Sequence, residues 1–197
     1  MNRLVTAFIL TILLIVVATP PVSAHGEVGI AGGFMSGFMH PLLGWDHVAA
    51  MVAVGLWGAF LGVPAIWLLP VVFPLIMACG GAIGVIGVPI PGVEIGIALS
   101  AIVLGSMIAL AARTPIWIAT VIAGAFAVFH GHAHGTELPH AVNALTYSAG
   151  FVTATGLLHL AGISLGLIIR WPIGKIAVQV VGGLIACAGL AFLIGIN

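Results

Sequence analysis

Two short segments of this chain combine histidine with a carboxylate at spacings that suit a metal ion. The first, residues 40–47, reads HPLLGWDH. If it is helical, His40 and His47 share one face, and Asp46 lies about 100° around the helix from His47. A carboxylate in apolar surroundings must be protonated, paired or bound to a cation, and no basic residue lies near Asp46 in the sequence. The pattern favours a cation ligand; the alternative is a helix-capping Asp46 beside histidines at the membrane interface.

The second segment, residues 129–137, reads FHGHAHGTE. His130 and His134 are i, i+4 neighbours on one helical face, and Glu137 follows close to the same stripe. Two imidazoles and a carboxylate suit a divalent transition metal such as nickel, cobalt, zinc or copper, whereas Mg²⁺ prefers oxygen ligands alone. His132 points elsewhere on the helix and is a candidate supporting or alternate ligand. The alternative is an exposed histidine-rich loop that binds metal adventitiously.

Both segments belong to a very apolar chain. Of its 197 residues, 62% are hydrophobic and only 4% are charged. Soluble domains carry about 25% charged residues, so the composition predicts a membrane protein in contact with a lipid bilayer. Four Lys and Arg residues leave no basic face for nucleic acid. The sequence also lacks a Gly-rich phosphate loop, so no ATPase is evident in this chain and an ATP-driven step needs another one.

The first 24 residues have the pattern of a secretory signal peptide. Arg3 supplies the basic start, Leu4–Ala18 supplies the apolar core, and residues 22–24 are small enough for cleavage after them. We therefore expect residues 1–24 to be removed and residues 25–197 to form a single transmembrane helical domain. The alternative is that the first segment is retained as a helix.

The remaining chain divides into stretches of the length that crosses a bilayer. A spanning helix needs roughly 20 apolar residues, and about six such stretches follow residue 24. We place them at Leu42–Leu61, Ala65–Val88, Val93–Ala112, Pro115–His134, Pro139–Ile169 and Pro172–Ile196. The predicted fold class is therefore an all-α polytopic membrane protein. The glycine-rich stretch Val28–Met39 is either a lead-in turn or an extension of the first span. Glycine pairs such as Gly80/Gly84 and Gly162/Gly166 permit close helix contact.

The charges divide between the two ends of the predicted spans. Arg113, Arg170 and Lys175 fall in alternate connections, which the positive-inside rule places in the cytoplasm. The carboxylates and most histidines fall at the outer ends of the spans: Glu27, Asp46, Glu94, Glu137, His25, His40, His47, His130, His132, His134 and His140. An outer face rich in carboxylate and imidazole has the composition of a cation entrance.

Three further features are weaker candidates for metal contact. Cleavage after residue 24 would place an α-amine beside the imidazole of His25. Glu94 opens a predicted span and is either an interfacial residue or a further entrance charge. Polar residues also follow an i+4 pattern in the fifth span, interrupted by a phenylalanine: Asn143, Tyr147, Thr155 and His159. This stripe is either an inward route for a cation or a set of ordinary interhelical hydrogen bonds.

The two segments also carry a family resemblance. His40-x5-Asp46-His47, followed by Phe129-His130-Gly131-x-Ala133-His134-Gly135-x-Glu137, resembles the signature motifs of the HupE/UreJ family of bacterial membrane proteins. The resemblance covers essentially the whole chain after residue 24. It implies nickel uptake for hydrogenase or urease maturation, with cobalt in some members. It also implies metal-handling roles for these motif residues: His40, Asp46, His47, His130, His134 and Glu137.

The sequence and the resemblance together predict a secondary transporter or channel-like permease and not an enzyme. Its cargo would be a divalent ion, Ni²⁺ first and Co²⁺ as the alternative, with no prosthetic group. We expect a bacterial inner-membrane protein whose mature N-terminus and metal-binding segments face the periplasm. The rival hypothesis is an intramembrane zinc-dependent hydrolase, which needs similar ligands and an activated water. A metal sensor or chaperone is a third possibility, and a homo-oligomer is left open.

Overall fold

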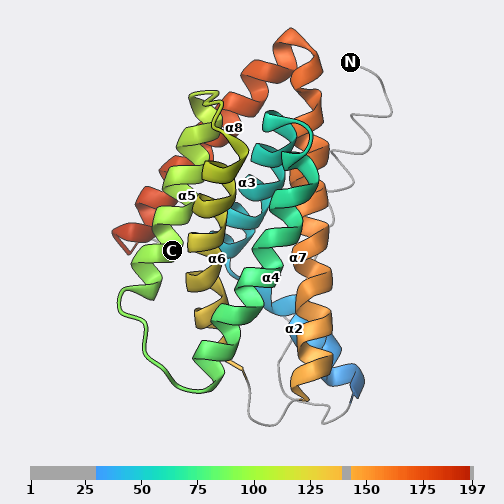
Figure 1. Ribbon diagram of the computed structural model, residues 1–197, viewed down its shortest axis with the longest axis vertical. Coiled ribbons are helices and arrows are strands. Elements are labelled where there is room, and N and C mark those ends of the chain that lie inside the picture. Colours follow the sequence, from blue (N-terminus) through green and yellow to red (C-terminus); the bar gives the residue numbers. More distant parts are fainter. Residues whose placement is uncertain (1–29, 139–142, 196–197) are drawn as a thin grey trace.

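The computed structural model describes residues 30–138 and 143–195, and every regular element within these two ranges is helical (Figure 1). The elements are α2 (Ile30–Leu43), α3 (Trp45–Leu61), α4 (Ala65–Val85), α5 (Val93–Ala109), α6 (Ile116–Thr136), α7 (Ala144–Gly166), the 3₁₀ turn η1 (Leu167–Arg170) and α8 (Pro172–Leu193). The all-α prediction is confirmed. The predicted signal peptide, His25 and His140 lie outside the described residues.

Helices α3 to α8 follow the order of the six predicted spans. Four helical segments are long and apolar enough to cross a membrane: α4, α6, α7 with η1, and α8. With 17 residues, α5 is shorter than a typical span. Helix α2 meets α3 at an angle of 84°, and the two together are apolar enough for one further span. The glycine-rich stretch before residue 40 is therefore neither a turn nor a straight extension of the first span. Most of it belongs to the separate helix α2, which meets α3 at a bend.

Helix α3 lies at the centre of the bundle. All of its residues from Ala50 to Phe60 except Val52 are buried, which is expected of a helix that is apolar on every side. It packs against α7, α5 and α4. Around it, α4 pairs with α6, α5 pairs with α8, and α2 lies along α7 (Figure 1). The central helix therefore holds the residues that follow its N-terminus against the surrounding helices.

Glycine allows α4 and α6 to approach backbone to backbone. A Cβ on Gly131 would collide with the Met77 carbonyl, and one on Gly135 with the Gly81 carbonyl. The glycine pairs that the sequence singled out are also at close contacts: Gly80 and Gly84 face the α6 backbone, and Gly162 and Gly166 face α3. The glycines of the second histidine segment thus admit a neighbouring helix.

The two ends of the bundle differ in chemistry. The α3–α4, α5–α6 and α7–α8 connections lie together at the upper end in Figure 1, and Arg113 and Arg170 fall in or beside them. Exposed tryptophans that suit a membrane interface lie near the same end: Trp67, Trp117 and Trp171. At the opposite end, α6 ends, α7 begins, and α5 begins with Glu94 in its first turn.

Candidate metal centre

The first histidine segment bends at Gly44, where α2 meets α3 at 84°. Gly44 has φ −95° and ψ 110°, an extended conformation that ends α2 and precedes α3. A Cβ on Gly44 would lie 2.9 Å from the Asp46 carboxylate and 3.0 Å from the His47 ring, so a side chain there would crowd both. His40 and His47 therefore do not share one face of a continuous helix. They converge because the chain bends between them.

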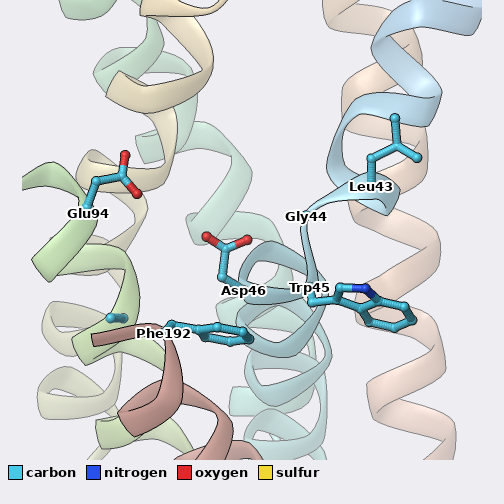
Figure 2. Close-up of a pocket in the computed structure, with 7 residues that line it drawn as sticks. Leu43, Gly44, Trp45, Asp46, Glu94 and Phe192 are labelled. Carbon is cyan, nitrogen blue, oxygen red and sulfur yellow. The ribbon is translucent and has the colours of Figure 1, made fainter. Parts of the chain in front are cut away.

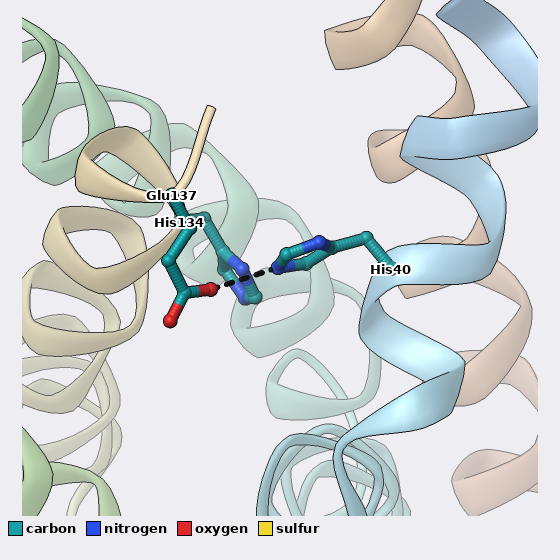
Figure 3. A group of neighbouring side chains, drawn as sticks. All are labelled: His40, His134 and Glu137. Carbon is teal, nitrogen blue, oxygen red and sulfur yellow. Dashed lines mark hydrogen bonds and ion pairs between the residues drawn. The ribbon is translucent and has the colours of Figure 1, made fainter. Parts of the chain in front are cut away.

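A three-residue group lies where α2 meets the end of α6. His40 Nε2 is 3.0 Å from an Oε2 of Glu137, the residue that follows α6. The ring of His134 packs edge-on against His40, with 4.8 Å between centroids. One ligand atom from each of the three residues lies within 4.8 Å of the others (Figure 3). Two imidazoles and a carboxylate at this spacing can hold a divalent ion after small side-chain movements.

The other two motif histidines continue this group inward. His47 packs against His134 with 4.3 Å between ring centroids, and against His130 with 4.9 Å. His40, His134, His47 and His130 therefore form one continuous row of imidazoles, which we call the histidine row. His40 is partly exposed and His130 is fully buried. The row runs from the surface of the bundle into its interior.

Neighbouring acceptors set the tautomers of the two inner rings. The Asp46 Oδ1 accepts hydrogen bonds of 2.8 Å from His47 Nδ1 and from the His47 backbone amide, which leaves the lone pair of His47 on Nε2. The Ser100 hydroxyl donates to the Ile97 carbonyl at 2.6 Å. It therefore accepts from His130 Nε2 at 2.9 Å, which leaves the lone pair of His130 on Nδ1.

The nitrogens left over by these bonds lack partners. His47 Nε2, His130 Nδ1 and both ring nitrogens of His134 are buried and have no hydrogen-bond partner among the residues the structure describes. Buried polar atoms are normally paired, because an unpaired one costs about 1–3 kcal/mol. Several such nitrogens side by side indicate that the row is built for a ligand that accepts imidazole lone pairs, and a metal ion has that property.

A cleft of about 460 Å³ opens beside Asp46 (Figure 2). It lies between the start of α3, the start of α5 and the end of α8, and both Asp46 and Glu94 line it. The remaining lining residues are apolar or glycine: Leu43, Gly44, Trp45, Ala98 and Phe192. With two carboxylates and no basic side chain in its lining, the cleft attracts cations toward the row.

The structure places the other candidate residues outside the row, although the Tyr147 ring packs against His40. The Nε2 of His132 donates to the Val88 carbonyl at 2.8 Å, so this ring ties α6 to the α4–α5 connection. Asn143 is the N-cap of α7, where its side chain accepts from the Leu145 and Thr146 amides. Tyr147 lies 5.8 Å from His40 between ring centroids. His159 is buried deeper in the bundle, beyond the row.

His132 therefore provides a test of which histidines handle metal. We expect His132→Gln to leave metal affinity and uptake within about twofold of wild type, because its ring points away from the row. Loss of the buried bond to Val88 should cost about 1 kcal/mol of stability. Thermal unfolding in detergent and metal titration of the same preparation measure both quantities. A large loss of affinity with unchanged stability would place His132 among the ligands.

Sequence reasoning missed the side chains that surround the row. Ser100 bonds His130, Phe151 packs 4.3 Å from His134, and Phe73 packs 5.7 Å from His130, between ring centroids. Ser100 carried a usable signal, since a polar residue inside an apolar span needs a partner. The two phenylalanines carried none, because apolar residues are ordinary in a membrane helix.

Comparison with known proteins covers nearly the whole chain. Residues 12–192 match the family described as HupE / UreJ protein. The chain is 43% identical over 187 residues to Protein HupE of Rhizobium leguminosarum bv. viciae, an alignment that covers 94% of this chain and 97% of that protein. No solved structure matches the chain. Both histidine segments fall inside the matched region.

Proposed function

We propose that this chain, which belongs to the HupE/UreJ family, carries Ni²⁺ from the periplasm to the cytoplasm. Membership of this family supports a general role in nickel or cobalt uptake. In this proposal it is a secondary transporter of the bacterial inner membrane, and the metal serves hydrogenase or urease maturation. Co²⁺ is the alternative cargo. The observation that carries the proposal is the histidine row, which begins beside the Glu137 carboxylate, is bonded by Asp46 at His47, and ends at the fully buried His130.

The geometry supports capture at the outer end of the row. A cation drawn to the cleft meets Asp46 and Glu94, and Asp46 leads to His47, whose ring packs against His134. His40, His134 and Glu137 offer nitrogen and oxygen ligands together. Mixed ligands of this kind suit borderline ions such as Ni²⁺ and Co²⁺. Four imidazoles together with the Glu137 and Asp46 carboxylates exceed the four ligands of one closed site, so the ion can exchange one ring for the next. Such an exchange favours transport over permanent retention.

The membrane potential supplies enough free energy for this process. A divalent ion that moves inward gains about 4.6 kcal/mol per 100 mV, twice the value for a single charge. At about 1.4 kcal/mol per decade, this gain corresponds to more than three decades of accumulation. The exposed basic residues Arg113 and Arg170 lie at the other end of the bundle, which under the positive-inside rule supports the inward direction.

The proposal predicts uptake that depends on the potential. Purified protein in proteoliposomes should accumulate Ni²⁺ when a potassium diffusion potential makes the interior negative, and accumulation should stop when the potential is collapsed. Excess Co²⁺ should compete more strongly than Mg²⁺, because imidazole ligands favour the transition metal. Protein-free liposomes and liposomes with the opposite potential are the controls.

Two results would contradict the proposal. Uptake that does not respond to the potential would rule out a potential-driven permease. Tight retention of Zn²⁺ through purification, with no uptake of any ion by protein that is folded and correctly oriented, would favour the intramembrane hydrolase instead.

A further inference from the structure

A further buried histidine lies beyond the inner end of the row. His159 is in α7, fifteen residues after its first residue Ala144, which places it roughly 22 Å along the helix. The Phe73 ring of α4 lies between this histidine and the row. Its centroid is 5.7 Å from that of His130 and 5.6 Å from that of His159. All three side chains are essentially inaccessible to solvent. One aromatic ring therefore separates two buried imidazoles.

The polar atoms around His159 are unsatisfied. Both of its ring nitrogens lack a hydrogen-bond partner in the part of the chain that the structure describes, and so does the hydroxyl of the buried Thr155, one turn earlier on α7. Two exposed hydroxyls on this helix behave differently. Thr153 donates to the Ala149 carbonyl at 2.7 Å and Ser164 to the Leu160 carbonyl at 2.8 Å, and both of these residues are exposed. The His159 nitrogens and the Thr155 hydroxyl, which lack partners, thus lie on the buried side of α7.

Helix α4 presents an oxygen to the same place. Proline lacks an amide hydrogen, so Pro74 cannot bond the carbonyl of Pro70 four residues earlier. That carbonyl faces the His159 ring, although no ring nitrogen reaches it with the geometry of a full hydrogen bond. An imidazole and a released carbonyl therefore lie together between α4 and α7, and a buried hydroxyl lies one turn earlier on α7.

The position of His159 is held by close helix packing. A Cβ on Gly55 of α3 would collide with the His159 carbonyl, so the central helix lies directly against this turn of α7. A buried histidine with two unpaired nitrogens is costly in an apolar bundle, and a rigid backbone gives it little freedom to find partners elsewhere. Part of this cost is offset if a cation binds the ring nitrogen that carries the lone pair of the neutral imidazole.

We propose that His159, Thr155 and the Pro70 carbonyl form an inner binding site for the transported divalent cation, separated from the histidine row by the Phe73 ring. The proposal rests on the transport function proposed above and adds the next position of the ion after His130. Transfer between the two sites requires rotation of the Phe73 side chain. The ion then exchanges row nitrogens for a nitrogen of His159.

The test separates binding at the row from passage beyond it. The variants are His159→Gln and Thr155→Val, with Thr153→Val as the matched control on the exposed side of α7. Ni²⁺ titration of detergent-purified protein measures binding, and the initial rate in proteoliposomes measures uptake. We expect His159→Gln to keep row affinity within about threefold and to lower uptake about tenfold or more. Thr155→Val should lower uptake by a smaller factor, and Thr153→Val should change neither quantity.

A change of ligand chemistry at the same position distinguishes contact with the ion from a structural role. A thiolate favours Zn²⁺ over Ni²⁺ more strongly than an imidazole does. His159→Cys should therefore raise the ratio of Zn²⁺ to Ni²⁺ uptake several-fold. A lower rate with an unchanged ratio would show that His159 only supports packing, and would overturn the proposal.

Other outcomes are equally decisive. Wild-type uptake by the His159→Gln variant would overturn the inner site and leave the proposed transport function intact. Loss of both binding and uptake in His159→Gln and Thr155→Val would assign this face of α7 to the folding of the row, which also overturns the inner site. If the wild-type protein itself takes up no metal, the proposed function fails first.

Discussion

Replacing His134 with glutamine should reduce Ni²⁺ affinity and uptake about 100-fold or more, the largest effect expected of any single substitution. His134 contacts both His40 and His47, so it links the outer three-residue group to the rest of the row. Neither of its ring nitrogens is engaged within the protein. Glutamine is similar in size but cannot supply the imidazole lone pair. Isothermal titration in detergent and initial uptake rates in proteoliposomes measure the two losses.

The matched control is His132→Gln, the same change two residues earlier on the same helix. This control removes a histidine of α6 that bonds a carbonyl and does not touch the row. Equal losses of affinity in the two variants would mean that general disturbance of α6 causes the effect. Wild-type uptake by His134→Gln would remove the row from the transport route.

Replacing Asp46 with asparagine should reduce uptake by about 10–100-fold while the protein stays folded. Asparagine keeps an oxygen that can accept from the His47 amide, so the local turn persists. It removes the negative charge from the cleft and weakens the bond that fixes the His47 tautomer. The ion then meets a less attractive entrance and a less well oriented ring. Uptake measured over a range of Ni²⁺ concentrations reports both effects.

Glu94→Gln is the control that isolates the charge. Glu94 lines the same cleft, and no described residue forms a hydrogen bond with its carboxylate. We expect only a few-fold decrease in uptake at low Ni²⁺ and low ionic strength, and this decrease should vanish in high salt. If the Asp46→Asn defect vanishes in high salt as well, Asp46 acts only by attraction and does not orient His47.

The sequence was sufficient to predict the all-α class, the order of helices α3 to α8, and that the two histidine segments lie at one end of the bundle. Runs of apolar residues report the spans directly, because the bilayer requires a minimum length of hydrophobic helix. Arg113 and Arg170 predict an orientation by a similarly local rule. Both histidine segments were placed at one depth by counting spans, and the ring contacts between His47 and His134 agree with that placement.

The contacts between distant segments could not be read from the sequence. His40 meets Glu137 across 97 positions, and that pairing depends on which helices are neighbours. The bend at Gly44 was hidden because the chain has 28 glycines, most of which serve helix packing in a protein of this kind. Asn143 is different: an asparagine directly before an apolar run is an N-cap signal that the interpretation as a polar stripe overlooked.

The division of the row between α2–α3 and α6 has a consequence for biosynthesis. A chain inserted from its N-terminus has His40 and His47 in place long before His130 and His134 leave the ribosome. Helix α2 also packs mainly on α7, which is inserted later still. The complete histidine row therefore forms only near the end of translation. A prematurely terminated chain that lacks α6 retains His40 and His47 but not His130 and His134.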